Sequence, residues 1–379
     1  MNGAYDVLYG AQLAFRVRGK DASMRRWLEE TYGRRCIAEP DDNRRILLEI
    51  QYEKHIPIPD GSSRVGRTAG WTTDGFCVSE GFGWAVIPMG QLLSESPFII
   101  RGQEHFDPLR LLGYIIEPIV MIRSLLYGFL FMHSSAVVID GEALVFPAWE
   151  NTGKTSLVLS MAHGGATILS DDRCVLCPER KAAGVPRPLN LLNYNFRVFP
   201  EYKHSVKPMK KVALAGDSLL FHFNKRFGQN MQGLPMRVLG VALKASAILA
   251  TTKVPLPEDF PVGMDLPVRA IVALGKHSGQ GYKDALQPIT RESLLSQLTS
   301  CFMFENIRLL RRIWEWEFLC PEGTDGMIES IRQLHEAVAK ARLAEFVDDN
   351  LMQFSLSESC SRAEWHHIGR QIRTRFCKR

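Results

Sequence analysis

The sequence has no uninterrupted apolar run long enough to cross a membrane. Its most apolar region, 109–139, is interrupted by Arg110, Glu117, Pro118, Arg123 and His133. Residues 1–15 contain Asp6 and no continuous apolar core, so we expect no signal peptide. These absences predict a soluble, cytoplasmic protein with no membrane partner.

An excess of charge of one sign is also missing. The 46 Lys and Arg residues, set against 41 Asp and Glu, give a net charge of +5 over 379 residues. So mild a balance does not favour nucleic-acid binding, whereas an acidic peptide partner is compatible with it. We therefore expect no nucleic acid among the partners.

The cysteines form no disulfide framework. Eight are scattered along the chain: Cys36, Cys77, Cys174, Cys177, Cys301, Cys320, Cys360 and Cys377. Cys174 and Cys177 stand at CxxC spacing, but no second pair or histidine cluster accompanies them. We expect two buried thiols on a strand rather than a metal or redox site. Internal repeats and low-complexity tracts are absent as well.

What the chain does contain is enough apolar residues, 46%, to bury a large core. We predict an N-terminal accessory region over 1–106, a core over 107–320, and a helical segment with a basic tail over 321–379. The N-terminal region shows no catalytic constellation. We expect it to recognise a substrate or to form a homo-oligomer.

Apolar periodicity and turn residues predict individual elements. Helices are expected over Asp21–Tyr32, Pro108–Phe131 (amphipathic, kinked near Pro118), Arg291–Leu310 and Asp325–Phe346. Strands are expected over Arg45–Ile50, within Phe76–Ile87, over Val268–Leu274, and in a hairpin that turns at Gly141-Glu142. The tail from Ser361 is either flexible or docked on the surface.

One stretch organises the rest of the chain. Val145–Pro147 is typical of a buried strand, Ala148–Thr155 (AWENTGKT) leaves it, and Thr155–Ala162 is typical of a helix. A loop in this position can wrap a triphosphate with its backbone N–H groups, a lysine and a hydroxyl that ligates Mg²⁺. Ala148 stands where the strict motif has its first glycine. An alanine is tolerable there only if the backbone at that position keeps a negative φ.

A second element, 166–172 (ATILSDD), follows about one helix later. In a parallel α/β unit, the next strand brings its C-terminal end beside the phosphate loop. One of Asp171 and Asp172 can then hold Mg²⁺ while the other accepts a proton. The alternative is an ordinary solvated turn.

Together these residues resemble the kinase domain of the HPr kinase/phosphorylase family, which shares its nucleotide-binding core with PEP carboxykinase. The resemblance rests on His133-Ser134-Ser135-Ala136, the loop Ala148–Thr155, Ser170-Asp171-Asp172, and Pro186-Arg187-Pro188-Leu189-Asn190-Leu191. It implies an α/β fold, a P-loop core like those of PEP carboxykinase and HPr kinase, here with an N-terminal α+β accessory domain. It also implies transfer of the γ-phosphoryl group of ATP to a serine hydroxyl.

The resemblance and the loop chemistry assign roles to named residues. ATP is expected to be held by Asn151, Thr152, Gly153, Lys154, Thr155 and Ser156, and Mg²⁺ by Thr155 with Asp172. Asp171 is expected to accept the proton of the acceptor hydroxyl. His133 is either a packed residue or a neighbour that orients a carboxylate. Arg187 is expected to bind phosphate or an acidic peptide.

The acceptor is not fixed by these motifs. By the resemblance, the expected acceptor is a serine of a peptide or protein. A recognisable carrier-protein-binding signature is missing, which weighs against a carrier protein and favours a peptide or other nonstandard substrate, as in relatives that phosphorylate lasso-type precursor peptides. We expect it to bind between the Arg187 region and the N-terminal region. The basic residues after Leu189–Pro200, which are Lys203, His204, Lys207, Lys210 and Lys211, form either a solvated loop or part of that site.

Trp149 and Glu150 depart from the small residues usual in such a loop, and Glu150 must point away from the phosphates. A nucleotide-binding regulatory protein without efficient transfer therefore remains an alternative. A kinase acting on a sugar or nucleoside is another.

Overall fold

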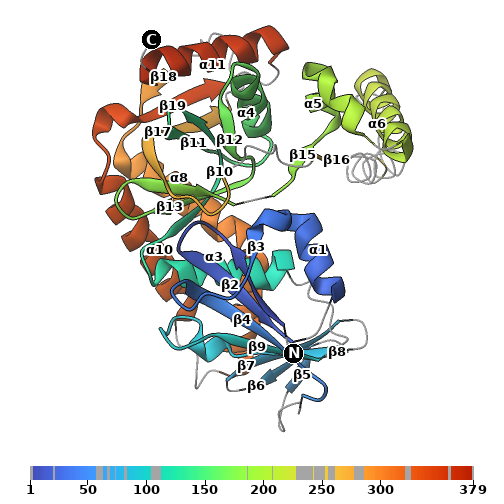
Figure 1. The fold of residues 1–379 in the computed structure, drawn as a ribbon, viewed down its shortest axis with the longest axis vertical. Helices are drawn as coiled ribbons and strands as arrows, with labels where there is room; N and C mark the ends of the chain where they lie inside the picture. The colour runs from blue at the N-terminus through green and yellow to red at the C-terminus, as the bar shows by residue number, and fades with distance from the viewer. Residues whose placement is uncertain are drawn as a thin grey trace.

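The computed structural model describes residues 3–19, 22–56, 63–65, 69–72, 74–80, 83–103, 112–185, 187–206, 208–227, 242, 252–254, 261–276, 286–320, 326–356 and 360–377 (Figure 1). Its helices and sheets make it a mixed α/β protein, as expected. No helix in these ranges is both long and apolar enough to span a bilayer. Parts of the expected elements at 21, 81–82, 108–111 and 325, with Pro186 and Lys207, lie outside the described residues.

Within the described residues, the N-terminal part forms a nine-stranded sheet in the order β3-β1-β2-β4-β9-β8-β7-β6-β5. Its elements are β1 Ala4–Leu8, β2 Leu13–Arg18, α1 Ala22–Tyr32, β3 Ile37–Ala38, β4 Arg45–Glu53, β5 Ser63–Val65, β6 Ala69–Thr72, β7 Gly75–Glu80, β8 Gly83–Ile87 and β9 Ile99–Gln103. The expected helix α1 and the strands β4, β7 and β8 are confirmed.

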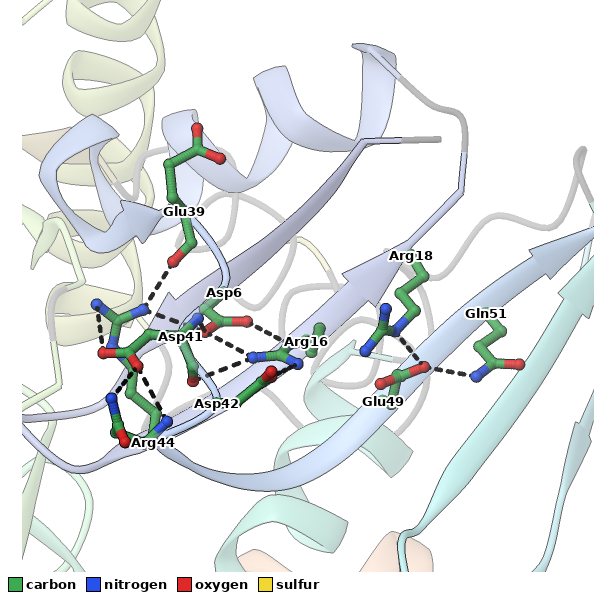
Figure 2. A network of polar contacts seen from close by, with 10 residues as sticks. Asp6, Arg16, Arg18, Glu39, Asp41, Asp42, Arg44, Glu49 and Gln51 are labelled. Carbon is green, nitrogen blue, oxygen red and sulfur yellow. Dashed lines mark hydrogen bonds and ion pairs between the residues drawn. The ribbon is translucent and has the colours of Figure 1, made fainter. Parts of the chain in front are cut away.

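One margin of this sheet is held by a buried ion pair (Figure 2). Asp6 on β1 is fully buried and accepts a 2.7 Å hydrogen bond from Arg16 Nε on the adjacent strand β2. The same carboxylate accepts from Arg44 Nη1 at 3.1 Å and from the backbone N–H of Asp41 at 3.0 Å. Since each partner satisfies part of a buried charge, the 41–44 turn is fixed against the sheet.

A second sheet, eight-stranded within the described residues, forms the core around the phosphate loop. Its strands are β10 Leu130–Ile139, β11 Glu142–Pro147, β12 Thr167–Ser170, β13 Arg173–Cys177, β14 Lys181–Gly184, β17 Leu266–Lys276, β18 Leu286–Pro288 and β19 Leu351–Leu356. The pairings β11-β10-β13-β14-β17-β11 close a ring, and β19 and β18 continue from β17. The hairpin β10–β11 and the strand β17 were expected.

Successive side chains along the strands point to opposite faces of the sheet and so divide the apolar core into two layers. Leu144 and Phe146 of β11 face the side covered by α4 (Lys154–His163) and α11 (Arg362–Phe376), whereas Val145 faces the opposite side. That opposite side belongs to one apolar cluster which continues into the N-terminal sheet, where Tyr9 meets Phe131 edge-on at 5.6 Å. Period-two alternation thus places each face of β11 in a different layer.

The helix expected over Pro108–Phe131 differs from the observed one. A π-helical turn over Leu112–Ile116 precedes α3, Glu117–Leu125, and β10 already begins at Leu130. The helix stops because the chain turns through Gly128, at φ +75°. It is also buried on every side rather than amphipathic, since it packs between β4, β10 and α10, Met327–Ala344.

Arg123 on α3 explains how a charged residue is accommodated in that buried helix. Its guanidinium donates to the backbone carbonyls of Leu47, Gln91, Ser94 and Ser96 at 2.6–2.9 Å. The arginine thereby satisfies backbone carbonyls of β4 and of the 91–96 segment from inside the core.

The helix expected over Arg291–Leu310 is two helices, α8 Arg291–Glu305 and α9 Ile307–Leu319. Asn306 breaks them apart: it leaves the helical region at ψ 4°, and its side chain donates back to the Phe302 carbonyl. α10 matches the expected helix over Asp325–Phe346. The tail is helical and docked rather than flexible, because Trp365, Ile368 and Ile372 of α11 are buried.

A small lobe projects beside the core (Figure 1). It comprises β15 Leu189–Leu191, α5 Asn193–Val198, a 3₁₀ turn Pro200–Ser205, α6 Pro208–Phe227 and β16 Thr252–Val254. The basic segment, expected either as a solvated loop or as part of the substrate site, is helical where it is described, with Lys203 in the 3₁₀ turn and Lys210 and Lys211 on α6. Cys174 and Cys177 are buried free thiols on β13, as expected.

Candidate active site

The phosphate-loop segment connects β11 to α4. Asn151 and Gly153 adopt left-handed backbone conformations, at φ +58° and +104°, which asparagine and glycine tolerate best. Ala148 is not among the residues with positive φ, so its Cβ is accommodated. Its backbone N–H donates to the His133 carbonyl at 3.1 Å. The loop thus begins against β10 and ends at the N-terminus of α4.

Lys154 folds back over the loop. Its Nζ donates to the carbonyls of Ala148 and Trp149 at 3.0 and 2.9 Å, and the residue is 7% exposed. Burial lowers the pKa of this amine, against the raising effect of Asp172 and other nearby acids. The Thr152 hydroxyl also donates to the Trp149 carbonyl. A cation placed among loop carbonyls is ready to exchange them for anionic oxygens.

Trp365 on α11 supports the loop from behind. A Cβ built on Gly153 would lie 2.4 Å from the indole of Trp365. Close behind, Ser160 Oγ on α4 and His366 Nδ1 are 2.8 Å apart. Gly153 is required here both by its positive φ and by the approach of the indole.

Asp171 and Asp172 lie in a break between two collinear strands rather than in a solvated turn. β12 and β13 both pair antiparallel with β10, and the backbone N–H of Ser134 donates to the Asp172 carbonyl at 3.1 Å. β11 is also antiparallel to β10, so β11 and β12 run in the same direction with α4 between them in sequence. This arrangement brings the acids beside the loop.

The two carboxylates have opposite pKa shifts. Asp171 is 5% exposed, and burial raises its pKa to about 6, although the Thr155 hydroxyl and the Asn190 backbone N–H act to lower it. Burial also acts to raise the pKa of Asp172, but Arg187 and other cations outweigh it and hold that pKa well below its usual range. One acid near neutrality beside one that stays ionised is suited to divided roles.

A buried network holds Asp172. Arg187 Nη1 donates to Asp172 Oδ2 at 2.9 Å, and its Nη2 donates to Glu117 on α3. Glu117 also accepts from Arg173 Nη1 at 3.0 Å and from the Tyr32 hydroxyl at 2.7 Å. Burial alone would raise the pKa of Glu117, but the two arginines lower it. Arg187 is thus engaged by two carboxylates, and its expected phosphate contact remains a prediction.

His133 lies between Asp172 and a residue that sequence reasoning missed. Its Nδ1 is 3.5 Å from Asp172 Oδ1 and in close contact with Glu305 Oε1 at the end of α8. The structure therefore brings His133 to the acidic pair, as the resemblance implied.

The sequence-predicted residues converge on one pocket of about 180 Å³. It is lined by His133, Glu150, Asn151, Thr152, Gly153, Lys154, Thr155, Asp171, Asp172, Asn190, Leu192 and Tyr194. Arg187 stands behind Asp172, and the Ser156 hydroxyl accepts from Asn195 Nδ2 at 3.1 Å. The Thr155 hydroxyl lies within hydrogen-bonding reach of Asp171, and Asp172 lines the same pocket.

Three network residues were not predicted: Glu117, Arg173 and Glu305. A signal did exist for the first, because Glu117 interrupts the most apolar region of the sequence, where an unpaired charge would be costly. No comparable signal marks Glu305, because it is the last residue of α8, where a charged side chain is ordinary.

Comparison with known proteins adds no assignment. No protein-family model matches the chain, and a search of curated proteins finds no match.

Proposed function

We propose that this chain is an ATP-dependent kinase that transfers the γ-phosphoryl group to a serine hydroxyl of a peptide or protein. The single observation that carries the proposal is the shared pocket of Lys154, Asp171 and Asp172 at a strand–loop–helix junction. The order β11–loop–α4–β12 also supports a P-loop core like those of PEP carboxykinase and HPr kinase. The N-terminal sheet is then an accessory part.

The loop residues bind the nucleotide. The N-terminus of α4 and the backbone N–H groups of 151–156 favour anionic oxygens, and Lys154 neutralises charge on the β- and γ-phosphates. Glu150 at the pocket rim must turn outward, where its exposed position allows it to do so.

Asp171 is assigned as the proton acceptor because its pKa of about 6 is matched to neutral pH. The acceptor oxygen forms a bond to the γ-phosphorus as the bond from that phosphorus to the β–γ bridging oxygen breaks. The electron pair leaves with ADP, and the hydroxyl proton passes to Asp171. Positioning and charge stabilisation carry most of the rate enhancement in such transfers.

The residues present also fit Mg²⁺. Asp171 Oδ1 is buried and makes no hydrogen bond of normal geometry to the described residues, and the neighbouring donors are carboxylate and hydroxyl oxygens, which Mg²⁺ prefers. Thr155 and Asp172 are the proposed ligands, with Asp171 also within reach of Thr155. When bound, Mg²⁺ supplies charge neutralisation at the phosphate oxygens.

Glu150 favours a second candidate, a nucleotide-binding regulator that transfers poorly, because an acid in the pocket lining repels a triphosphate. Labelled ATP separates the two. The kinase proposal expects label on serine in a cell extract or a peptide set, and Lys154→Ala should abolish both ATP binding and transfer while the melting temperature stays near that of the wild type. ATP binding without any transfer would favour the regulator, and equal ATP affinity in Lys154→Ala would remove the loop from both.

A further inference from the structure

A second cavity, of about 340 Å³, adjoins the phosphate pocket. Its floor is apolar and buried, formed by Phe131 and Met132 of β10 and by Leu294, Leu298 and Phe302 of α8. His133 lines this cavity as well as the phosphate pocket, so it forms a wall common to both. The volume falls at the lower end of the range for ligand sites.

The position of the cavity in the sheet suits a ligand. It lies at the C-terminal ends of the parallel strands β11 and β17, which contribute Pro147, Leu274 and Gly275. Ligands of α/β sheets bind outside these ends.

The phosphate loop indicates which end of the nucleotide site the cavity adjoins. Its wall includes Ala148 and Trp149, the residues whose carbonyls accept from Lys154. In a phosphate loop the backbone N–H groups cradle the α- and β-phosphates, whereas the lysine reaches the β- and γ-phosphates. The cavity therefore adjoins the γ end of the nucleotide site, on the side from which an acceptor approaches.

The cavity also presents buried polar atoms with open capacity. The Glu305 side chain is 7% exposed, and its Oε2 has no hydrogen-bond partner among the described residues, since Arg173 Nε is 3.9 Å away. His133 Nε2 lacks one as well. A buried carboxylate oxygen is costly unless a donor reaches it, and an acceptor hydroxyl or a peptide N–H can supply that donor.

The rim extends the apolar surface outward. Trp149, which lines the cavity, packs against Phe304 with ring centroids 4.6 Å apart, and the two residues are 46% and 48% exposed. Exposed aromatic pairs beside a cavity are typical of recognition surfaces. A ligand that fills the floor and continues over this rim is extended, as a peptide is.

We propose that this cavity binds a large apolar side chain next to the acceptor serine, with the peptide leaving over Trp149 and Phe304. The inference rests on the proposed kinase function and names its substrate class. It moves the acceptor away from the Arg187 region, because the Arg187 amino groups are already held by Asp172 and Glu117.

The test uses two short synthetic peptides that differ only in the residues flanking their single serine, leucine in one and glycine in the other. Binding to Asp171→Asn protein loaded with Mg-ADP is measured by calorimetry, so that no turnover is needed. Ser300→Trp narrows the cavity, which Ser300 lines, whereas Ser293→Trp makes the same change at an exposed α8 position outside the lining.

The leucine peptide should bind on the order of ten- to a hundredfold more tightly than the glycine peptide, as expected for burial of one leucine side chain. Ser293→Trp should keep this ratio, and Ser300→Trp should reduce it to about threefold or less. Equal affinities in the unblocked protein, or an unchanged ratio in Ser300→Trp, would overturn the proposal. If free leucinol binds as tightly as the leucine peptide, the claim that the substrate is a peptide would be overturned. Failure of the kinase proposal is seen separately, as ATP binding by the wild type without any transfer of label to serine.

Discussion

Tyr32 donates a hydrogen bond of 2.7 Å to the buried carboxylate of Glu117. The tyrosine belongs to the helix of the N-terminal sheet, and the glutamate leads through Arg187 to Asp172. The two sheets thus share an apolar cluster and are also joined by a series of hydrogen bonds and ion pairs that ends at the proposed active site.

Replacing the centre of this chain should affect both stability and rate. Glu117→Gln leaves Arg173 and Arg187 without their shared carboxylate, and breaking a buried pair typically costs about 3–5 kcal/mol. We expect a lower melting temperature and a lower kcat, with ATP affinity retained. Tyr32→Phe is the milder control, because it removes one hydrogen bond and no charge. A Glu117→Gln enzyme with normal kcat would show that the network does not position Asp172.

The same carboxylate predicts a pH dependence. The folded-state pKa of Glu117 is lowered, so its contribution to stability is present above the unfolded pKa and is lost as the pH falls through the folded value. Acid unfolding should therefore begin at a higher pH in Tyr32→Phe than in the wild type, because the Tyr32 hydrogen bond helps to lower the pKa of Glu117. Matched melting curves between neutral and acidic pH would measure the difference.

The Asp171 carboxylate should lower the free energy of unfolding at neutral pH while raising the rate of phosphoryl transfer. Its pKa rises from 3.8 to about 6 on folding, so the folded state binds the proton more tightly, and stability falls as pH rises through that window. The free energy of unfolding of Asp171→Asn should therefore exceed that of the wild type at pH 7 by up to ~3 kcal/mol. At acidic pH the two proteins should be equally stable. The variant should lose about 10²- to 10⁴-fold in transfer rate. In the wild type, kcat/KM should fall as the pH drops through about 6. A flat profile would assign the base elsewhere.

Arg187 should resist conservative replacement. Two different amino groups of its guanidinium hold Asp172 and Glu117, and a single ammonium cannot reproduce that fork. Arg187→Lys should reduce kcat nearly as much as Arg187→Ala, by about tenfold or more. Arg311→Lys, at an exposed position on α9, is the matched control. Full activity in Arg187→Lys would mean that charge alone suffices.

Gly153 should tolerate no side chain. Gly153→Ala forces a Cβ into the left-handed region at φ +104° and against the Trp365 indole. The backbone term alone is about 1–2 kcal/mol, so we expect weaker ATP binding by calorimetry. Gly165→Ala, at φ +90° with no atom near its Cβ, separates strain from contact. Equal effects of both variants on ATP affinity would exclude a special role for the indole.

The loop, its flanking strand and helix, and the acidic pair could be predicted because each is local in sequence. Lys154 and Asp171 come together through one helix, so short-range pattern and the geometry of a βαβ unit are sufficient. The same holds for α1, α10 and β17. These segments carry their periodicity within a single element.

What could not be predicted depends on distant partners. Glu305 reaches His133 from a helix more than 150 residues later, and Glu117 meets Arg173 and Arg187 only after the sheet has formed. The end of α3 was missed because burial on all sides erases the amphipathic pattern, and the break at Asn306 because one side chain caps a turn inside an otherwise helical segment. The docking of α11 likewise depends on packing against α4, which is far away in the sequence.

The contact of α11 with the back of the phosphate loop has a consequence for folding. The bond between Ser160 and His366 spans 206 positions of the chain, far more than the local pairing of β10 with β11. Contacts of such separation form late, because chain closure must come before they contribute. The β10–β11 hairpin can therefore form before Gly153 gains its support from Trp365. Nucleotide binding during refolding should lag behind formation of this hairpin and mark the docking of the C-terminal helix.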